Sequence, residues 1–292
     1  MSKNITQLTE ATSFLDTDLF YAGIDPSGSP LDRKVTSLNI QRYLPMGQNA
    51  ITGLKLSNNG SDANNDIDIA VGRVVAGTGD YNLILTSALT KQLNATWAVG
   101  TNQGGLDTGS KANSTWYHVW VIGRVDTHVV DVLFSTSVST PTMPANYTKK
   151  RRIGAVKTNS SGNLLAFVQY GDTFLWASPP ALDVDDATLT TTKKNYTLTS
   201  VPLGLAVNVL FNMVSSNAAT NRVYISNPNL TDLAPSQTAT PLSTLTANTT
   251  ATLFSQGRMI TDVSQQISMR ASASSTTVRV AVLGWTDPRG KW

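Results

Sequence analysis

The 292-residue sequence contains no cysteine and only two histidines, His118 and His128. The absence of cysteine excludes disulfide scaffolds, cysteine-ligated zinc, iron–sulfur clusters and cysteine nucleophiles. With only two histidines, most histidine-based metal sites and Ser-His-Asp triads are disfavoured. Glu10 is the single glutamate, so a carboxylate pair that hydrolyses glycosides would have to come from aspartates. We therefore expect no enzyme activity, no cofactor and no metal.

Charged residues and long apolar runs are also scarce. Charged side chains make up 14% of the chain, against roughly 25% in an average soluble domain. The formal net charge is only +3, which gives no indication of a nucleic-acid partner. The longest apolar stretch, Val201 to Val214, is interrupted by Gly204 and two asparagines and is shorter than the about 20 residues that cross a bilayer. We expect no membrane insertion, and the N-terminal sequence has no apolar core of signal-peptide length.

Short runs of alternating apolar and polar residues extend along most of the chain and predict β-strands. The run Trp116–Ile122 alternates in this way, Arg124–Thr127 suits a reversal, and Val129–Phe134 suits an antiparallel return, which together predict a hairpin. Further strands are predicted at Asp66–Val75, Asn82–Leu85, Ile153–Thr158, Leu164–Tyr170, Val207–Val214, Arg222–Ser226, Gln266–Ala271 and Val278–Trp285.

Helical periodicity is rare. Leu38–Leu44 predicts a short helix, because Thr36 and Ser37 precede it as possible caps and Pro45 ends it. Thr86–Leu93 is predicted to be either a short helix or a loop.

These patterns divide the chain into three parts. Residues 1–46 form a small α+β lead segment, with a hairpin around Leu19–Ile24 and Lys34–Thr36, that is too small to hold its own core. Residues 47–178 form a central β domain. Ser178-Pro179-Pro180 and the acidic stretch Asp183–Asp186 then suit a linker, and residues 187–292 form a second β domain. We predict an all-β protein with two antiparallel β-sandwich-like domains in tandem after the lead segment, without the fixed repeats of a β-helix or propeller.

Two groups of residues suggest metal binding but fit it poorly. Asp62, Asn64 and Asp66, followed by Asp68, resemble the start of a calcium loop, but the glycine and glutamate that an EF-hand needs are missing. We interpret Asp66–Ile69 as a strand with its carboxylates on the solvent face. His118 and His128 have no third ligand, and a packing role with a satisfied ring nitrogen is the better interpretation for His118.

The run Lys149-Lys150-Arg151-Arg152, with Lys157 nearby, is the one dense basic segment. It suits a phosphate contact, a strand start with solvated charges at a sheet edge, or an inter-subunit salt bridge. We favour the second and third interpretations, because no nucleic-acid motif accompanies the run.

The glycine-rich run Gln103–Gly109 is no P-loop, since no Gly-Lys-Ser/Thr follows. Its glycines are expected to adopt positive φ in a tight turn.

Several patches of sequence carry a resemblance to a known family. They are Leu15-Asp16-Thr17-Asp18-Leu19-Phe20, Arg33-Lys34-Val35-Thr36 and Leu38–Leu44 in the lead segment, then Asn65–Ala70, Gly104–Gly109, Thr115–Val119, Val130–Ser135 and Lys150–Gly154, and finally Leu283–Gly290. The lead segment resembles the virion-attachment end of tailed-bacteriophage fibre proteins. The central patches resemble a module widespread in phage structural proteins, and the final patch resembles the closing strand of phage tail proteins.

The resemblance implies a non-enzymatic tail fibre in the virion, made in the host cytoplasm and assembled as a homo-oligomer, a trimer. It implies attachment to other tail or virion proteins through residues 1–46, with residues 187–292 presented to a host-surface glycan or protein. It assigns no catalytic or receptor-binding residues. Since no heptad pattern is present, a trimer would form through the β domains. The alternatives are a head fibre, decoration or baseplate protein, and a glycan depolymerase or esterase, which the shortage of Glu and His disfavours.

Overall fold

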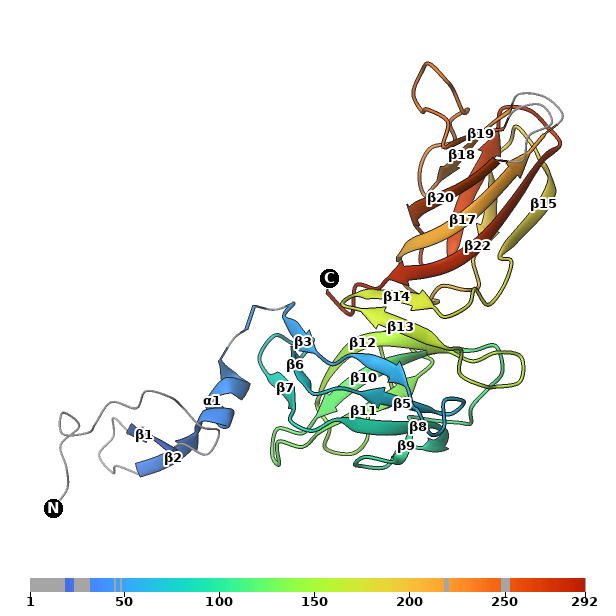
Figure 1. Ribbon diagram of the computed structural model, residues 1–292. Coiled ribbons are helices and arrows are strands. Elements are labelled where there is room, and N and C mark those ends of the chain that lie inside the picture. Colours follow the sequence, from blue (N-terminus) through green and yellow to red (C-terminus); the bar gives the residue numbers. More distant parts are fainter. Residues whose placement is uncertain are drawn as a thin grey trace.

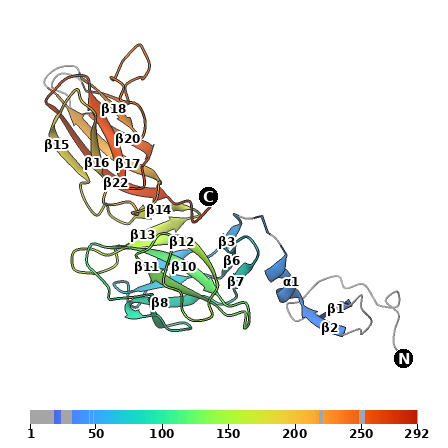
Figure 2. The ribbon, with the colours of Figure 1, turned by 180° about the vertical axis from the view of Figure 1, so that it is seen from behind.

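The computed structural model describes residues 19–23, 32–44, 46–47, 49–217, 221–247 and 253–291. Within these residues the chain forms 22 strands and one helix, so the predicted all-β, sandwich-like class is confirmed. Figures 1 and 2 show a small N-terminal segment followed by two β-rich bodies. We call these the central body, built on β3–β12, and the C-terminal body, built on β13–β22.

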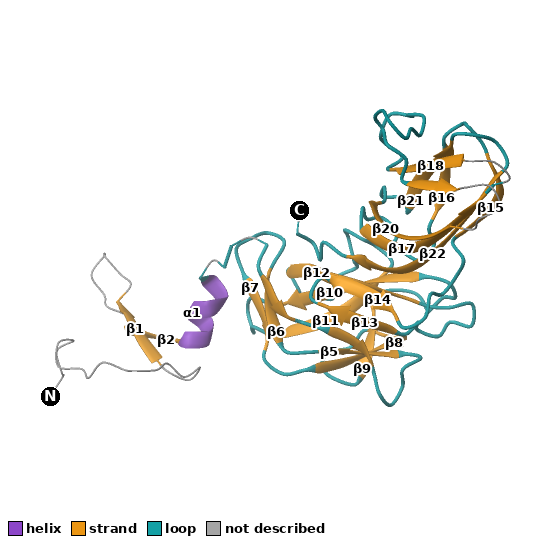
Figure 3. Cartoon of the chain, turned by 45° about the horizontal axis from the view of Figure 1, so that its top comes forward, coloured by secondary structure: helices purple, strands orange, loops and turns teal. Residues whose placement is uncertain are grey.

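The N-terminal segment has the predicted elements. Strands β1 (Leu19–Gly23) and β2 (Asp32–Thr36) pair antiparallel and lead directly into α1 (Ser37–Tyr43). The side chain of Thr36 accepts a hydrogen bond from the backbone N–H of Asn39, which is the N-cap contact that the sequence predicts. Figure 3 shows α1 between this hairpin and the central body.

The central body contains two sheets. A seven-stranded sheet has the order β12-β10-β11-β9-β8-β5-β4, and a three-stranded sheet has the order β3-β6-β7. The predicted hairpin is present, because β10 and β11 pair antiparallel. The strands are β3 (Ile51–Gly53), β4 (Leu56–Asn58), β5 (Asp66–Ile69), β6 (Gly72–Val75), β7 (Asn82–Leu85), β8 (Leu89–Thr96), β9 (Gln103–Leu106), β10 (Trp116–Gly123), β11 (Val130–Ser135) and β12 (Lys149–Lys157).

The C-terminal body is a sandwich of two sheets. One has the order β13-β14-β22-β17-β20, with β15 also paired to β22, and the other has the order β16-β21-β18-β19. Apolar side chains from both, such as Phe211, Ile225 and Met269, are buried in one cluster between them. The strands are β13 (Phe167–Tyr170), β14 (Thr173–Trp176), β15 (Val184–Leu189), β16 (Lys194–Thr197), β17 (Asn208–Ser216), β18 (Asn221–Ser226), β19 (Leu245–Ala247), β20 (Leu253–Ile260), β21 (Gln266–Ala271) and β22 (Thr276–Thr286).

A continuous core joins the two bodies. The ring of Trp285, near the end of β22, stacks on Phe174 with centroids 5.2 Å apart and meets the edge of Trp116 of β10 at 5.4 Å. Strands β13 and β14 lie within the predicted central domain, residues 47–178, yet they hydrogen-bond into the sheet of β22. This sheet therefore crosses the domain boundary expected at residue 178, and the aromatic cluster joins the two bodies.

The segment Thr86–Leu93 was expected to be a helix or a loop, and this expectation is wrong. It contributes to strand β8, in which Lys91 and Leu93 are fully buried on the same face. Since a lysine occupies an inward position, the alternation of apolar and polar residues is hidden in the sequence.

Most of the acidic stretch Asp183–Asp186 lies in strand β15, which begins at Val184, rather than in a linker. The backbone of β15 pairs with β22. Asp185 forms an ion pair with Arg279 at 2.8 Å, and Asp186 forms one with Lys194 at 2.7 Å. The two aspartates within β15 are thus paired with basic residues of β22 and β16.

The glycine-rich run Gln103–Gly109 is also corrected by the structure. Its first half is strand β9, and among its three glycines only Gly109 has positive φ. Gly104 and Gly105 are required for close packing instead. A Cβ atom on Gly104 would collide with the carbonyl oxygen of Thr96, and one on Gly105 would lie 2.8 Å from the ring of Phe134.

Candidate functional site

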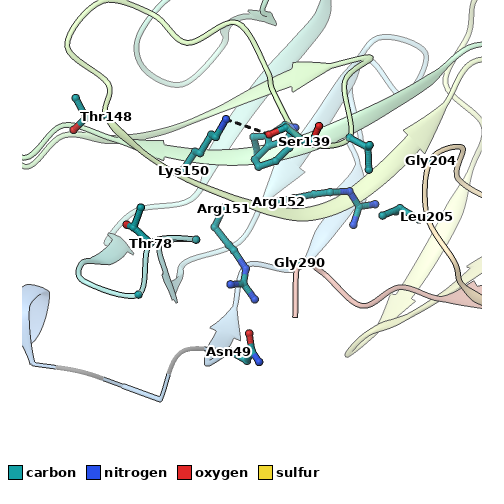
Figure 4. Close-up of a pocket in the computed structure, with 14 residues that line it drawn as sticks. Asn49, Thr78, Ser139, Thr148, Lys150, Arg151, Arg152, Gly204, Leu205 and Gly290 are labelled. Carbon is teal, nitrogen blue, oxygen red and sulfur yellow. Dashed lines mark hydrogen bonds between the residues drawn. The ribbon is translucent and has the colours of Figure 1, made fainter. Parts of the chain in front are cut away.

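A pocket of about 540 Å³ opens where the two bodies meet. We call it the junction pocket, and Figure 4 shows the side chains around it. The central body contributes a turn after β6, Trp120 of β10, a loop after β11 and the start of β12, while the C-terminal body contributes the loop at Gly204 and the tail at Gly290. Its volume lies in the range of pockets that hold small ligands.

Strand β12 brings three consecutive cationic residues, Lys150, Arg151 and Arg152, to this pocket. The pairing of β12 with β10 shifts register between Val119 and Trp120, because Val119 pairs with Gly154 and Trp120 pairs with Arg152. A β-bulge of this kind re-aims side chains. Here both arginines are buried at the junction of the two bodies.

Arg152 is held by a buried clamp. Its two terminal nitrogens donate to both carboxylate oxygens of Asp287 at 2.6 and 2.7 Å, and its Nε donates to Nδ1 of His118 at 2.9 Å. Burial acts to raise the pKa of Asp287, but the charge and hydrogen bonds of Arg152 outweigh it, so the pKa is lowered. The clamp links β10 and β12 of the central body to the tail that follows β22.

His118 is a neutral member of this clamp. The pKa of His118 is lowered to about 3, mainly by burial and secondly by the nearby positive charge of Arg152. Its Nδ1 lone pair accepts the hydrogen bond from Arg152, which confirms the expected packing role with a satisfied ring nitrogen. His128 lies at the far end of the hairpin, where its Nδ1 lies 2.9 Å from the hydroxyl of Tyr81. The two histidines therefore do not form a common site.

The tail Asp287–Gly290 is hydrogen-bonded to the central body. Arg289 donates from Nε to the carbonyl oxygen of Ile153 at 2.8 Å and from Nη2 to that of Leu54 at 2.9 Å. Its Nη1 lies 3.5 Å from the carboxylate of Asp172. Nothing in the sequence pattern indicated these roles, since Asp287 and Arg289 follow the last strand and are far in sequence from their partners.

Arg151 is buried but poorly matched. The residue is 5% exposed, its Nε donates to the carbonyl oxygen of Arg289 at 3.3 Å, and its buried Nη2 has no hydrogen-bond partner in the described part of the chain. Burial lowers the pKa of Arg151. Lys150 lies beside it, with Nζ 3.2 Å from the carbonyl oxygen of Ser139 and 5.4 Å from the ring centre of Trp120, and burial lowers its pKa as well.

The expectation of solvated charges is therefore wrong for Arg151 and Arg152, although β12 does begin at Lys149 and does lie at a sheet edge. Lys149 pairs with the exposed Asp80 at 2.6 Å. Arg151 and Arg152 are buried because the C-terminal tail covers this part of β12 and supplies Asp287. Arg152 thus forms its salt bridge within the chain, and an inter-subunit bridge by this run stays a prediction.

Two of the three aspartates in the calcium-like segment accept hydrogen bonds from protein side chains. The carboxylate of Asp62 accepts from the side chain of Asn65, and that of Asp68 accepts from Asn59 and Thr90. Asp66 is buried rather than on the solvent face, and burial, followed by the charges of Asp62 and Asp68, raises its pKa. Across the described ranges, no group of three His, Cys, Asp or Glu side chains is arranged to hold a metal ion.

Comparisons with known proteins give no assignment for this chain. No protein-family model matches it, and no curated protein matches its sequence. The resemblance to phage fibre proteins thus rests on the sequence patches alone. In the described residues, no helix has the length and apolarity needed to cross a membrane.

Proposed function

We propose that this chain is a non-enzymatic structural protein of a bacteriophage virion, an oligomeric tail fibre. Residues 1–46 attach it to the tail, and residues 187–292 take part in attachment to the host surface. The proposal combines the sequence resemblance with the arrangement of the two β bodies, and it involves no catalytic residue, cofactor or metal.

The observation that carries the proposal is the contrast between the two ends of the chain. The β bodies are fixed to each other by the Arg152–Asp287 clamp and by the aromatic cluster around Trp285. The N-terminal hairpin and α1 stand to one side of them (Figures 1 and 2). A firmly joined two-body unit with a separate small segment suits a protein that is anchored at one end and presents the other.

The contact between the N-terminal segment and the central body is small and specific. Asn82 of β7 donates from its side-chain amide to the carbonyl oxygens of Gln41 and Leu44 at the end of α1. The ring of Tyr43 meets the edge of Tyr81 with centroids 5.3 Å apart, yet the side chains of Tyr43 and Leu44 stay more than half exposed. Exposed apolar side chains beside an anchor segment suit further contacts with a partner.

The buried polar groups support a structural role. Lys91 is paired with Asp131 at 3.2 Å and also donates to the carbonyl oxygens of Ala98 and Gly100. Together with the Arg152–Asp287–His118 clamp, this pair holds loops and bodies together. In each case the titratable groups are bonded to other protein groups, which leaves them poorly placed for acid–base chemistry on a substrate.

The test is incorporation into the virion. A chain lacking residues 1–46 should fold, as judged by an unchanged cooperative melting transition, but should be absent from purified particles, whereas the full-length chain should be present. An antibody label at the C-terminus should lie at the tip of the tail in electron micrographs. A label on the capsid or baseplate would instead support the head-fibre, decoration or baseplate alternatives, and incorporation of the truncated chain would contradict the anchor assignment.

Oligomerisation and host attachment need separate measurements. Mass measurement in solution should show three copies, and a stable monomer at micromolar concentration would contradict the trimer. Fluorescently labelled full-length protein should bind host cells and compete with infection. If it does not bind at high concentration, the role in host attachment is wrong even if the chain is a virion component.

A further inference from the structure

We propose that the junction pocket is a binding site for a small anionic sugar or a similar polar molecule, whose carboxylate or phosphate group is held by Arg151 with help from Lys150. This inference does not depend on the proposed virion role, because it rests on charge, burial and cavity geometry alone.

The first step is the uncompensated charge. Three cationic side chains line the pocket, while its described lining contains no aspartate or glutamate. Asp287 neutralises Arg152, whereas Lys150 and Arg151 have no carboxylate partner among the described residues. Moving a charge out of water is costly unless an opposite charge accompanies it. An anion entering the pocket would supply that partner.

The second step is a comparison with the other buried cations. Lys91, Arg152 and Arg289 each have a carboxylate oxygen within 3.5 Å. Arg42 of α1 donates to the side-chain oxygen of Asn39 instead, but it does not line the junction pocket. Arg151 differs, because within the described part of the chain its side chain donates only to a backbone carbonyl oxygen and its buried Nη2 has no hydrogen-bond partner. An arginine guanidinium can bind a carboxylate or phosphate group with two parallel hydrogen bonds. Of the buried cations that line the pocket, Arg151 is therefore the one whose charge no carboxylate of the described residues offsets.

The third step is the position of Arg151 in the pocket. Figure 4 shows its side chain extending from β12 toward Asn49 and Gly290, while Lys150 extends toward Ser139. Gly290 has φ +70, and a Cβ atom there would lie 2.9 Å from Nε of Arg151. The absence of a side chain at Gly290 therefore leaves room for the guanidinium group.

The fourth step is the nature of the ligand. In the remaining lining, four side chains offer amide and hydroxyl groups: Asn49, Thr78, Ser139 and Thr148. The other lining residues are glycines and the apolar residues Trp120, Val138 and Leu205. The volume of about 540 Å³ suits a molecule of monosaccharide size. A few polar side chains around one charged anchor are typical of a site that binds a polyhydroxylated anion, because the hydroxyl groups of the ligand need hydrogen-bond partners once they leave water.

The test uses the full-length protein and three matched sugars. Glucuronate carries a carboxylate, glucose 6-phosphate carries a phosphate, and glucose is neutral. Isothermal titration calorimetry should detect binding of at least one of the two anionic sugars with at least tenfold higher affinity than glucose. The one that binds more tightly identifies the preferred anion. Equal affinity for all three sugars, or no binding of either anionic sugar, would overturn the proposal without any variant being made.

Variants locate the site. Arg151→Met should weaken binding of the preferred anionic sugar at least tenfold and should leave the melting temperature within a few degrees of that of the unchanged protein. Lys149→Met is the control, because it removes the same charge from the same strand but lies outside the pocket, and its affinity should stay within twofold. Equal weakening by both variants, or undiminished binding by Arg151→Met, would contradict the assignment to Arg151.

Discussion

Arg152 and Asp287 lie 135 positions apart in the chain and form a buried two-point ion pair, with N–O distances of 2.6 and 2.7 Å. The pair fixes the tail after β22 to the edge strand of the central sheet. His118 completes it by accepting the Nε hydrogen of Arg152. The orientation of the two β bodies thus depends on a polar contact as well as on the aromatic cluster beside it.

Removing one partner of this pair should be strongly destabilising. Asp287→Asn leaves the charge of Arg152 buried without a counter-charge, so we expect the free energy of unfolding to fall by about 3–5 kcal/mol. Urea denaturation at pH 7 measures this. The control is Asp185→Asn, which breaks the half-exposed pair with Arg279 and should cost less than about 1 kcal/mol. Equal costs for the two variants would show that the buried pair has no special role.

The same clamp predicts a pH dependence through His118. The pKa of His118 is lowered to about 3 in the folded protein, while an unfolded chain has a histidine pKa of about 6.5. Between these values the unfolded state binds the extra proton, so stability falls as the pH falls below about 6.5. Asp287 does not counteract this above pH 4, since its lowered pKa makes it lose its contribution only at more acidic pH.

A His118→Gln variant should remove this slope, because a glutamine oxygen can still accept the hydrogen bond from Arg152 but does not titrate. Between pH 6.5 and pH 4.5 the unchanged protein should lose about 2–3 kcal/mol more stability than the variant, at about 1.4 kcal/mol per pH unit. Urea denaturation at several pH values measures the difference. An identical slope in both proteins would show that His118 is not the titrating group.

The buried pair of Lys91 and Asp131 should control the loop after β8. Asp131 accepts the backbone N–H of Gly100 at 2.7 Å, and Lys91 donates to the carbonyl oxygens of Ala98 and Gly100. Asp131→Ala should therefore lower the free energy of unfolding by about 3–5 kcal/mol and increase hydrogen exchange at the amide of Gly100. The exposed Asp126, paired with Arg124, provides the control, and its alanine variant should change neither measurement appreciably.

Close packing in β9 should make Gly104 intolerant of a side chain. Gly104→Ala places a methyl group against the carbonyl oxygen of Thr96, so we expect a loss of about 1–3 kcal/mol from forced backbone shifts. Gly60→Ala is a matched control because no atom lies within 4 Å of its added Cβ, and its stability should be almost unchanged. Thermal denaturation compares the two, and equal melting temperatures would contradict the packing argument.

Local sequence patterns were sufficient for many individual elements. The hairpin of β10 and β11 follows from alternation with a period of two residues, and α1 follows from the cap at Thr36. Both signals act between residues close in the chain, so they are visible without knowledge of the fold. The same patterns missed β8, because an inward lysine interrupts the apolar face, and misassigned β15, because its aspartates are paired across strands.

The sequence by itself determined that this is an all-β protein with a small α+β lead, since scarce helical periodicity and repeated two-residue alternation leave few other ways to bury its apolar side chains. Only the tertiary structure decided which charges of the basic run are buried, which one is paired and which one faces a pocket. Arg151 and Arg152 are adjacent and chemically identical in the sequence. Their difference arises because the distant tail brings a carboxylate to one of them and only a backbone carbonyl oxygen to the other.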